Sequence, residues 1–355
     1  MAWMDLCLRR AKCASGDLVM RLGAPQLDAY LEFLAVRSRP NTVLAVAYDL
    51  RVFFAVVGKP PPQVTAADVL GFVTAQHTGG TAERLQLVDG AGGVSARTVR
   101  RRLSSVSGLF GFLHARGDVD ANPVPRGLPT RRERQRPRQG VPLVRTPRTL
   151  PRILEPVQVD ALLAALRTWR DRAMAEAMVL GGLRRCEVLG LRLGDLQVAT
   201  RRVFIAEGKG GHQRLIPVSG RFFASVASYL DAERPADAGT DRLFLALKGA
   251  RRGRPLSPAG LDQILDSARE RAELAQATCH QLRHTCLTRL REAGMALEAV
   301  QAQAGHSSIE STRIYLHLAD DWLASQYRRA AEAIDAQMLP GKPIEASPSV
   351  VDGEP

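Results

Sequence analysis

Apolar residues in the first third of the chain recur with the period of amphipathic helices. Leu27, Leu31 and Leu34 predict a helix from Pro25 to about residue 39, where Pro40 interrupts the pattern. The same period predicts three further helices, with capping residues at or near their starts, over 42–58, 65–77 and 95–117. Together they predict a compact four-helix domain over residues 23–117, preceded by a loose arm over 1–22.

Residues 118–151 show neither the period of a helix nor the period of a strand, and they mark a domain boundary. From Arg126 to Arg152 the chain has nine arginines, five prolines and one acid, Glu133. This composition fits a solvated charged linker and fits equally a linker that follows a phosphate backbone. Both interpretations stay open on composition alone.

Beyond residue 152 the helical period returns, and one stretch interrupts it. Three helices are expected first, over 157–171, 172–182 and 183–190. The period then falls to two, which predicts three short antiparallel strands at 196–198, 201–207 and 212–219. Helical patterns follow at 222–234 and 257–272, in three segments between 279 and 318, and at 321–339.

These patterns predict a mainly α protein whose second domain, 152–339, is α+β with a small three-stranded antiparallel sheet. The tail over 340–355 contains Pro, Gly and Ser, and we expect it to be disordered.

The net charge of the chain limits the classes of partner that it is expected to bind. A net charge of +13 and a pI near 10.3 indicate a polyanionic partner. Nucleic acid is favoured over a membrane surface, because no long basic amphipathic helix or lipidation signal is present. No segment reaches the ~18 continuous apolar residues of a membrane span. The five cysteines form no CxxC pair, which favours reduced thiols in a cytosolic protein.

Candidate chemistry concentrates between Cys279 and Leu318. This stretch holds four of the seven histidines and one of the five tyrosines. Cutting a DNA phosphodiester without a metal requires cationic donors for the phosphate oxygens, a nucleophile, and a proton for the departing oxygen. The sequence offers Arg184 and Arg283 for the first task and Tyr315 for the second. The candidates for proton transfer and charge neutralisation are Lys209, His280 and His306.

Each of these residues also has an ordinary structural interpretation. Arg184 is one of 44 arginines, and Glu187 could be its surface partner or could fix its geometry. Lys209 lies in a Gly-rich turn that is not a P-loop, since GxxxxGK[ST] is absent. The spacing of His280 and His284 permits a metal pair, but HQLRH lacks the Glu of HExxH. We therefore expect no metal and interpret His284 as a buried, hydrogen-bonded core residue.

Five short strings in this order resemble the tyrosine recombinase (phage integrase) family, including its Xer-like members. They are Gly182-Leu183-Arg184-x-x-Glu187-x-x-x-Leu191, Gly208-Lys209-Gly210, His280-x-x-Arg283-His284-Thr285, Gly305-His306-Ser307 and Thr312-x-x-Tyr315-x-His317. The helical domain and basic linker also resemble that family's SAM-like core-binding domain, on pattern alone. Ala304 and Gln281 depart from residues common in the family, but neither change removes a functional group.

The resemblance implies a mechanism and an assembly. Tyr315 would attack the scissile phosphate and form a 3′-phosphotyrosine bond, while Arg184 and Arg283 hold the phosphoryl oxygens. Lys209 would be the general acid, His280 would assist proton transfer, and His306 would hydrogen-bond the phosphate. No metal, ATP or other cofactor is implied. The implied partners are double-stranded DNA and three further copies in a tetramer that exchanges its C-terminal helices, in the cytoplasm at the nucleoid and without a membrane.

Three alternatives remain at this point. A type IB topoisomerase-like enzyme would use the same residue types to relax DNA. A catalytically silent DNA-binding regulator would keep the fold without the reaction. An RNA-binding role lacks any RRM or KH signature.

Overall fold

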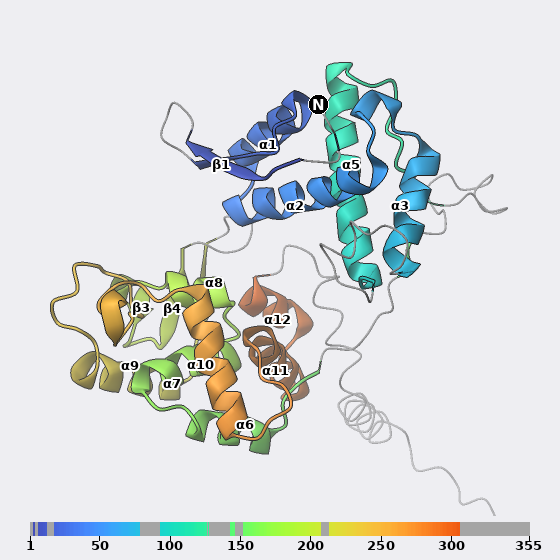
Figure 1. The fold of residues 1–355 in the computed structure, drawn as a ribbon. Helices are drawn as coiled ribbons and strands as arrows, with labels where there is room; N and C mark the ends of the chain where they lie inside the picture. Colours follow the sequence, from blue (N-terminus) through green and yellow to red (C-terminus); the bar gives the residue numbers. More distant parts are fainter. Residues whose placement is uncertain are drawn as a thin grey trace, which may run out of the picture. The chain divides into compact units, whose positions relative to one another are not determined.

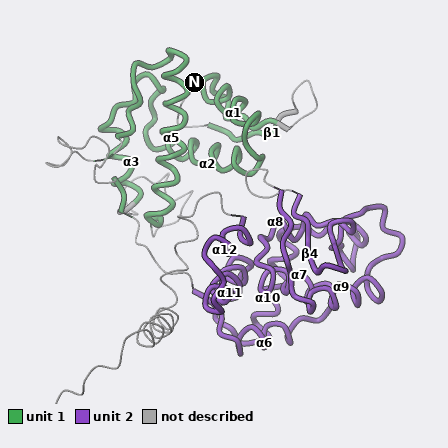
Figure 2. Tube along the Cα trace, turned by 180° about the vertical axis from the view of Figure 1, so that it is seen from behind, with its two compact units in different colours: residues 1–148 green, residues 149–355 purple. Residues whose placement is uncertain are grey.

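The computed structural model describes residues 3, 6–12, 18–78, 93–125, 127, 143–145, 152–206 and 213–305. The chain divides into two compact units, Met1–Arg148 and Thr149–Pro355 (Figure 2). The division falls inside the basic segment expected to be a linker, residues 118–151.

Unit 1 is built on helices, as its apolar period predicted. They are α1 (Pro25–Arg37), α2 (Pro40–Val57), the short 3-10 turn η1 (Pro61–Gln63), α3 (Ala66–Thr78) and α5 (Ala96–Arg116). Their apolar faces meet in one core that contains Phe53, Phe72 and Phe110. Helix α2 begins at Pro40 rather than at residue 42, because a proline at the first helical position needs no hydrogen bond from its nitrogen.

The arm expected over residues 1–22 is not loose in its described part. Strand β1 (Arg9–Lys12) pairs antiparallel with β2 (Leu18–Arg21), with Arg9 opposite Arg21. Strand β2 packs on α1, and the adjoining Leu22 is buried. The apolar period was too short to reveal this hairpin, because each strand has only four residues.

Helix α2 is, among the described residues, one helix long and apolar enough to cross a membrane. Its environment is that of a core helix, since seven of its residues are buried within unit 1. One of them, Asp49, is a carboxylate that accepts hydrogen bonds from Arg101 Nη1 (2.7 Å) and Ser105 Oγ (2.8 Å) of α5. A paired carboxylate in the middle of the helix fits packing against α5 better than contact with lipid.

Unit 2 combines helices with one small sheet (Figure 1). Its helices are α6 (Pro156–Ala164), α7 (Trp169–Val179), α8 (Arg185–Gly190), α9 (Gly220–Ala232), α10 (Pro258–Arg271), α11 (Cys279–Glu292) and α12 (Leu297–Ala304), with 3-10 turns η2 (Leu193–Asp195) and η4 (Gly249–Arg251). The sheet has the order β3 (Leu196–Gln197), β4 (Arg202–Ile205), β5 (Arg214–Pro217), and both pairs are antiparallel. The mainly α fold with a three-stranded antiparallel sheet is thus confirmed.

Helix α7 is central in unit 2, where it packs against α6, α8, α9 and α11. The sequence pattern had extended the preceding helix through Asp171, and this was wrong: α6 ends at Ala164 and α7 starts at Trp169. The first N–H groups of α7 are taken up by Thr168, which caps Asp171, and by the carboxylate of Glu233. That carboxylate is distant in sequence, so local pattern did not place the break.

Candidate functional site

Arg184 lies where the chain turns from α7 into α8. Gly182 has φ +69, a left-handed conformation that favours glycine, and a Cβ there would lie 3.2 Å from the Leu287 side chain. Arg184 follows as the N-cap residue of α8, in extended conformation. The tight glycine turn therefore delivers the arginine to the start of a helix, as the sequence suggested.

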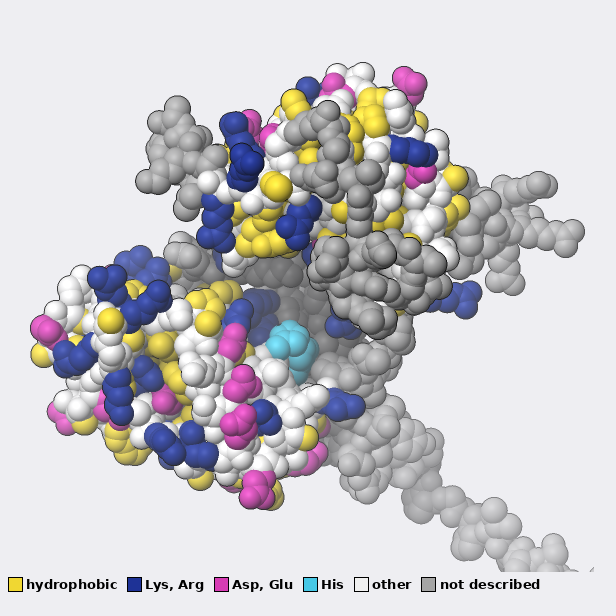
Figure 3. All heavy atoms as spheres, in the orientation of Figure 1, with side chains coloured by type: hydrophobic (Ala, Val, Ile, Leu, Met, Phe, Trp, Pro, Cys, Tyr) yellow, Lys and Arg dark blue, Asp and Glu magenta, His cyan; other side chains and the backbone are white. Residues whose placement is uncertain are grey.

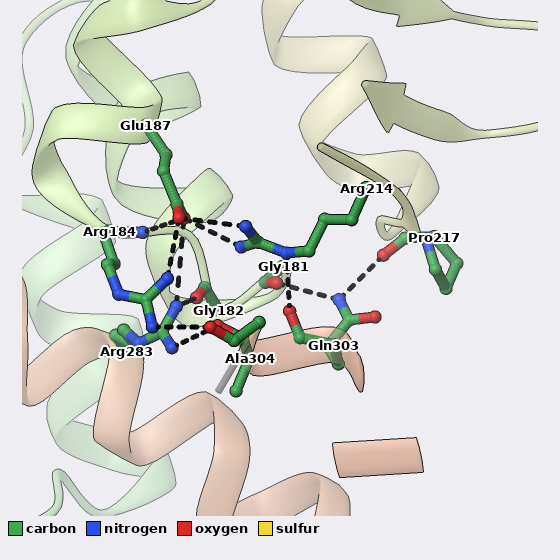
Figure 4. Close-up of polar contacts among 10 residues, drawn as sticks. Gly181, Gly182, Arg184, Glu187, Arg214, Pro217, Arg283, Gln303 and Ala304 are labelled. Carbon is green, nitrogen blue, oxygen red and sulfur yellow. Dashed lines mark hydrogen bonds and ion pairs between the residues drawn. The ribbon is translucent and has the colours of Figure 1, made fainter. Parts of the chain in front are cut away.

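The Glu187 carboxylate is the centre of the arrangement (Figure 4). Its side chain is 0% exposed, and it accepts hydrogen bonds from the backbone N–H of Arg184 (2.9 Å) and from Arg184 Nη1 (2.8 Å). Arg214 Nη1 and Nη2 each donate to one of its oxygens, at 3.0 and 2.9 Å, and Arg283 Nη1 lies 3.9 Å away. Of the two interpretations of Glu187, the structure supports the one in which it fixes the geometry of Arg184.

The pKa of Glu187 reflects this environment. Burial alone would raise the pKa of the carboxyl, but the hydrogen bonds from Arg214 and from the Arg184 backbone, with the charges of both arginines, lower it below its ordinary value. Glu187 is therefore ionised at neutral pH and binds its arginines as a charged group.

Arg283 lies on α11 and is 3% exposed, whereas His280 on the same helix is exposed. Arg283 Nη2 donates to the carbonyl of Ala304 at 2.6 Å, and Arg283 Nη1 donates to the carbonyl of Gly182. Arg184 and Arg283, which are about a hundred residues apart in sequence, thus come together around one carboxylate. The structure thus brings together the two arginines that the sequence assigned to the phosphate oxygens.

The C-terminal end of α12 receives hydrogen bonds from three different arginines. Its successive carbonyls at 303, 304 and 305 accept from Arg214 Nε (3.4 Å), Arg283 Nη2 (2.6 Å) and Arg184 Nη2 (3.1 Å). Unpaired carbonyls and the negative end of the helix dipole favour cations at this place. Gly305, the C-cap residue with φ +59, ends the helix immediately before His306.

His280 and His284 form a pair on α11, with His280 exposed and His284 half-buried. Figure 3 shows a cyan patch of histidine on the surface of unit 2. Their Nε2 atoms are 2.7 Å apart, so one ring donates a proton to the other. Burial, then the charges of His280 and Arg283, lower the pKa of His284 to about 4. At neutral pH the ring of His284 is therefore uncharged. His284 is hydrogen-bonded as expected, but it is half-buried rather than part of the core.

The low pKa of His284 predicts acid sensitivity in unit 2. The neutral ring in the folded state must gain a proton on unfolding below the ordinary pKa of 6.5, so stability falls as the pH drops from about 6.5 to 4. The maximum effect is about 3 kcal/mol. Urea unfolding at pH 7 and pH 4.5 measures it, and His284→Gln should flatten the difference. The exposed His114 is the control; if His114→Gln flattens it equally, the assignment to His284 is wrong.

Three candidate residues, Lys209, His306 and Tyr315, lie outside the described residues. Their roles remain those expected from sequence. The structure brings Arg184 and Arg283 together around Glu187, while His280 lies on the same helix as Arg283 and pairs with His284.

One member of the cluster, Arg214, is absent from the candidates that the sequence offered. It begins β5, where it is in phase with the buried Ile216 while Leu215 between them is exposed. In a strand, residues two apart share a face. An arginine in phase with a buried position was the available signal.

The cluster is suited to binding a phosphate. Three guanidinium groups surround one carboxylate, so these four side chains, with three positive charges and one negative charge, carry a net charge of +2. A phosphodiester carries one negative charge and its pentavalent transition state about two, so a rigid positive cluster stabilises the second more than the first. Burial raises the pKa of the Cys286 thiol to about 12, which removes this neighbouring sulfur as a nucleophile at neutral pH.

Comparison with known families agrees with the site. The phage integrase family matches residues 152–321, and the phage integrase N-terminal SAM-like domain matches residues 27–117. The tyrosine recombinase XerC of Pseudomonas fluorescens is 32% identical over 314 residues, covering 86% of this chain and 95% of the relative. The XerC of Roseiflexus sp. (strain RS-1) is 31% identical, covering 82% and 89%.

Solved structures share the fold at lower identity. The XerH site-specific recombinase bound to palindromic difH substrate has a TM-score of 0.64 at 18% identity, covering 86% of this chain and 84% of that one. The Tn1549 transposon integrase in complex with transposon right end DNA has a TM-score of 0.63 at 19% identity, covering 86% and 99%. The family matches span both units, and the arginine cluster lies within the phage integrase match; the chain therefore belongs to the phage integrase family and is a tyrosine recombinase.

Proposed function

We propose that this enzyme cuts and rejoins double-stranded DNA at specific sites through a covalent 3′-phosphotyrosine intermediate, without metal or ATP. The observation that carries the proposal is the arginine cluster. Arg184 and Arg283 are held together around the ionised Glu187. Preorganised cations of this kind stabilise a pentavalent phosphorus without the need for a metal ion.

The remaining chemistry is assigned to residues of the matching strings. Tyr315 attacks phosphorus and releases a 5′-hydroxyl, so one phosphorus–oxygen bond forms as another breaks. Lys209 protonates the departing 5′ oxygen, and His306 hydrogen-bonds the phosphate. His280 assists proton transfer from its place beside His284 on α11.

The assembly follows from the reaction. Exchanging strands between two duplexes requires four cuts, hence four active sites, and we propose a homotetramer on two DNA sites. Neighbouring copies would exchange the C-terminal segment 321–339, the amphipathic stretch that sequence predicts to be helical. Such an enzyme works in the cytoplasm, at the nucleoid.

A library of randomised duplexes, each nicked in one strand, tests the reaction. Cleavage just 5′ of the nick releases a short fragment with a 5′-hydroxyl, which diffuses away and traps the protein on the 3′ end. We expect an SDS-resistant adduct in EDTA without ATP. Sequencing the trapped DNA gives the target, and mass spectrometry of the adducted peptide gives the nucleophile.

The outcomes separate the alternatives. Absence of an adduct, with DNA bound, would identify a catalytically silent DNA-binding protein. An adduct accompanied by relaxation of supercoiled plasmid, without recombinant product from two target sites, would favour a topoisomerase-like enzyme.

A further inference from the structure

Arg214 holds the central carboxylate from the side opposite to Arg184. It comes from β5, 27 residues after Glu187, and its side chain is 12% exposed. Both terminal nitrogens form a fork on the two Glu187 oxygens, at 3.0 and 2.9 Å. Paired N–H donors on a carboxylate give the most directional ion pair available to side chains. With these two atoms engaged, Arg214 is placed to act on Glu187 rather than on a phosphate.

The guanidinium of Arg214 also lies against the turn that ends α12. A Cβ added at Gly305 would lie 2.9 Å from the guanidinium carbon, so this glycine is what permits the close approach. Arg214 Nε makes a long hydrogen bond to the Gln303 carbonyl, and the Gln303 amide donates to the carbonyls of Gly181 (2.8 Å) and Pro217 (3.1 Å). The end of α12 is therefore fastened to both the sheet and the Gly181–Gly182 turn (Figure 4).

The charge of Glu187 is divided among three guanidinium groups that lie at unequal distances from its oxygens. Arg214 and Arg184 occupy the carboxylate at hydrogen-bond distance, while Arg283 Nη1 stays at 3.9 Å. Without Arg214, the carboxylate would lose its strongest partner. It would then attract Arg283 into direct pairing and reduce the positive charge offered to a phosphate.

We infer that Arg214 is a positioning residue for strand cleavage: it saturates Glu187 and so leaves the charge of Arg184 and Arg283 for the scissile phosphate. The inference rests on the proposed function, because it concerns the same site. It adds to the reaction a residue that touches neither DNA nor the reacting atoms.

The test measures the rate of adduct formation at saturating target DNA for Arg214→Gln and Arg214→Lys. We expect Arg214→Gln to lower the rate about 10- to 100-fold, with the DNA affinity within a few-fold of wild type. The rate of Arg214→Lys should lie between those of the wild type and Arg214→Gln, because lysine keeps the positive charge but cannot form the two parallel hydrogen bonds. Arg202→Gln, at an exposed arginine of the same sheet, controls for the loss of one positive charge and should cleave at the wild-type rate.

A second substrate separates positioning from general damage. In a DNA whose scissile phosphate carries a methyl group in place of one non-bridging oxygen, the group is neutral and needs less cationic stabilisation. We expect the defect of the Arg214 variants to shrink to a few-fold on this DNA. An equal defect on both substrates would make Arg214 merely structural, and unchanged rates would also overturn the inference. Failure of the wild type to form any adduct would instead overturn the proposed function.

Discussion

Tyr315→Phe is expected to bind target DNA as tightly as the wild type and to form no covalent adduct. Phenylalanine keeps the ring and removes only the hydroxyl that would attack phosphorus. Loss of the nucleophile should therefore reduce adduct formation about a thousandfold or more, while binding, which depends on many phosphate contacts, is preserved. A mobility-shift assay measures binding, and a denaturing gel of the same samples measures the adduct.

Tyr327→Phe is the matched control, since it makes the same change twelve residues further along the chain. We expect it to cleave like the wild type. If Tyr315→Phe still cleaves and Tyr327→Phe does not, the nucleophile is Tyr327 and the assignment of the last matching string is wrong.

The tyrosines that the structure describes are poorly placed to be the nucleophile. Tyr229 is buried, donates its hydroxyl hydrogen to the Leu243 carbonyl at 3.1 Å and accepts from the Leu245 N–H. Burial raises the pKa of Tyr229 and likewise that of Tyr30. Tyr48 is exposed, but it lies in the segment that matches the SAM-like domain, outside the phage integrase match at residues 152–321. This leaves Tyr315 and Tyr327 as the candidates.

The parts of the fold that sequence predicted are those determined locally. Ser257 caps α10 by accepting the Gly260 N–H, and Thr65 and Asp68 form a reciprocal pair of hydrogen bonds at the start of α3. These contacts join residues three apart, so a short window of sequence contains both partners. Arg184 and Glu187 are also three apart, which made their pairing foreseeable.

The rest of the site depends on contacts between distant segments. The paired hydrogen bonds from Arg214 to Glu187 require β5 to be in its place in the sheet. The hydrogen bonds from Arg283 to the Gly182 and Ala304 carbonyls require α11 to pack against the segments that carry those carbonyls. Periodicity reports which face of an element is buried, and not which buried groups meet. The matching strings contain Arg184 and Arg283 and so indicated that these two residues belong to one site. They do not contain Arg214.

Replacing Glu187 tests whether the carboxylate holds the cluster together by its charge. Glu187→Gln keeps the shape of the side chain and removes its charge, leaving three largely buried guanidinium groups around a neutral amide. Removing one partner of a buried ion pair costs about 3–5 kcal/mol. For a unit of this size we expect the melting temperature of unit 2 to fall on the order of 10 °C, with cleavage reduced beyond what partial unfolding explains. Calorimetry and the adduct assay below the new melting temperature measure the two effects.

Glu155→Gln is the matched control, because Glu155 is a 67% exposed carboxylate that pairs with Arg289 at 2.9 Å. An exposed pair contributes at most about 1 kcal/mol, so this variant should melt close to the wild type.

The pH dependence of stability is a second test of the role of the Glu187 charge. A lowered carboxyl pKa gives stability that is present above the unfolded value of 4.5 and is lost as the pH falls through the folded value. Glu187→Gln should lack that loss below pH 4.5 while keeping the His284 dependence above it. If Glu187→Gln instead has the same melting temperature as Glu155→Gln, packing and not charge holds the arginines in place. The inference for Arg214 then loses its physical basis.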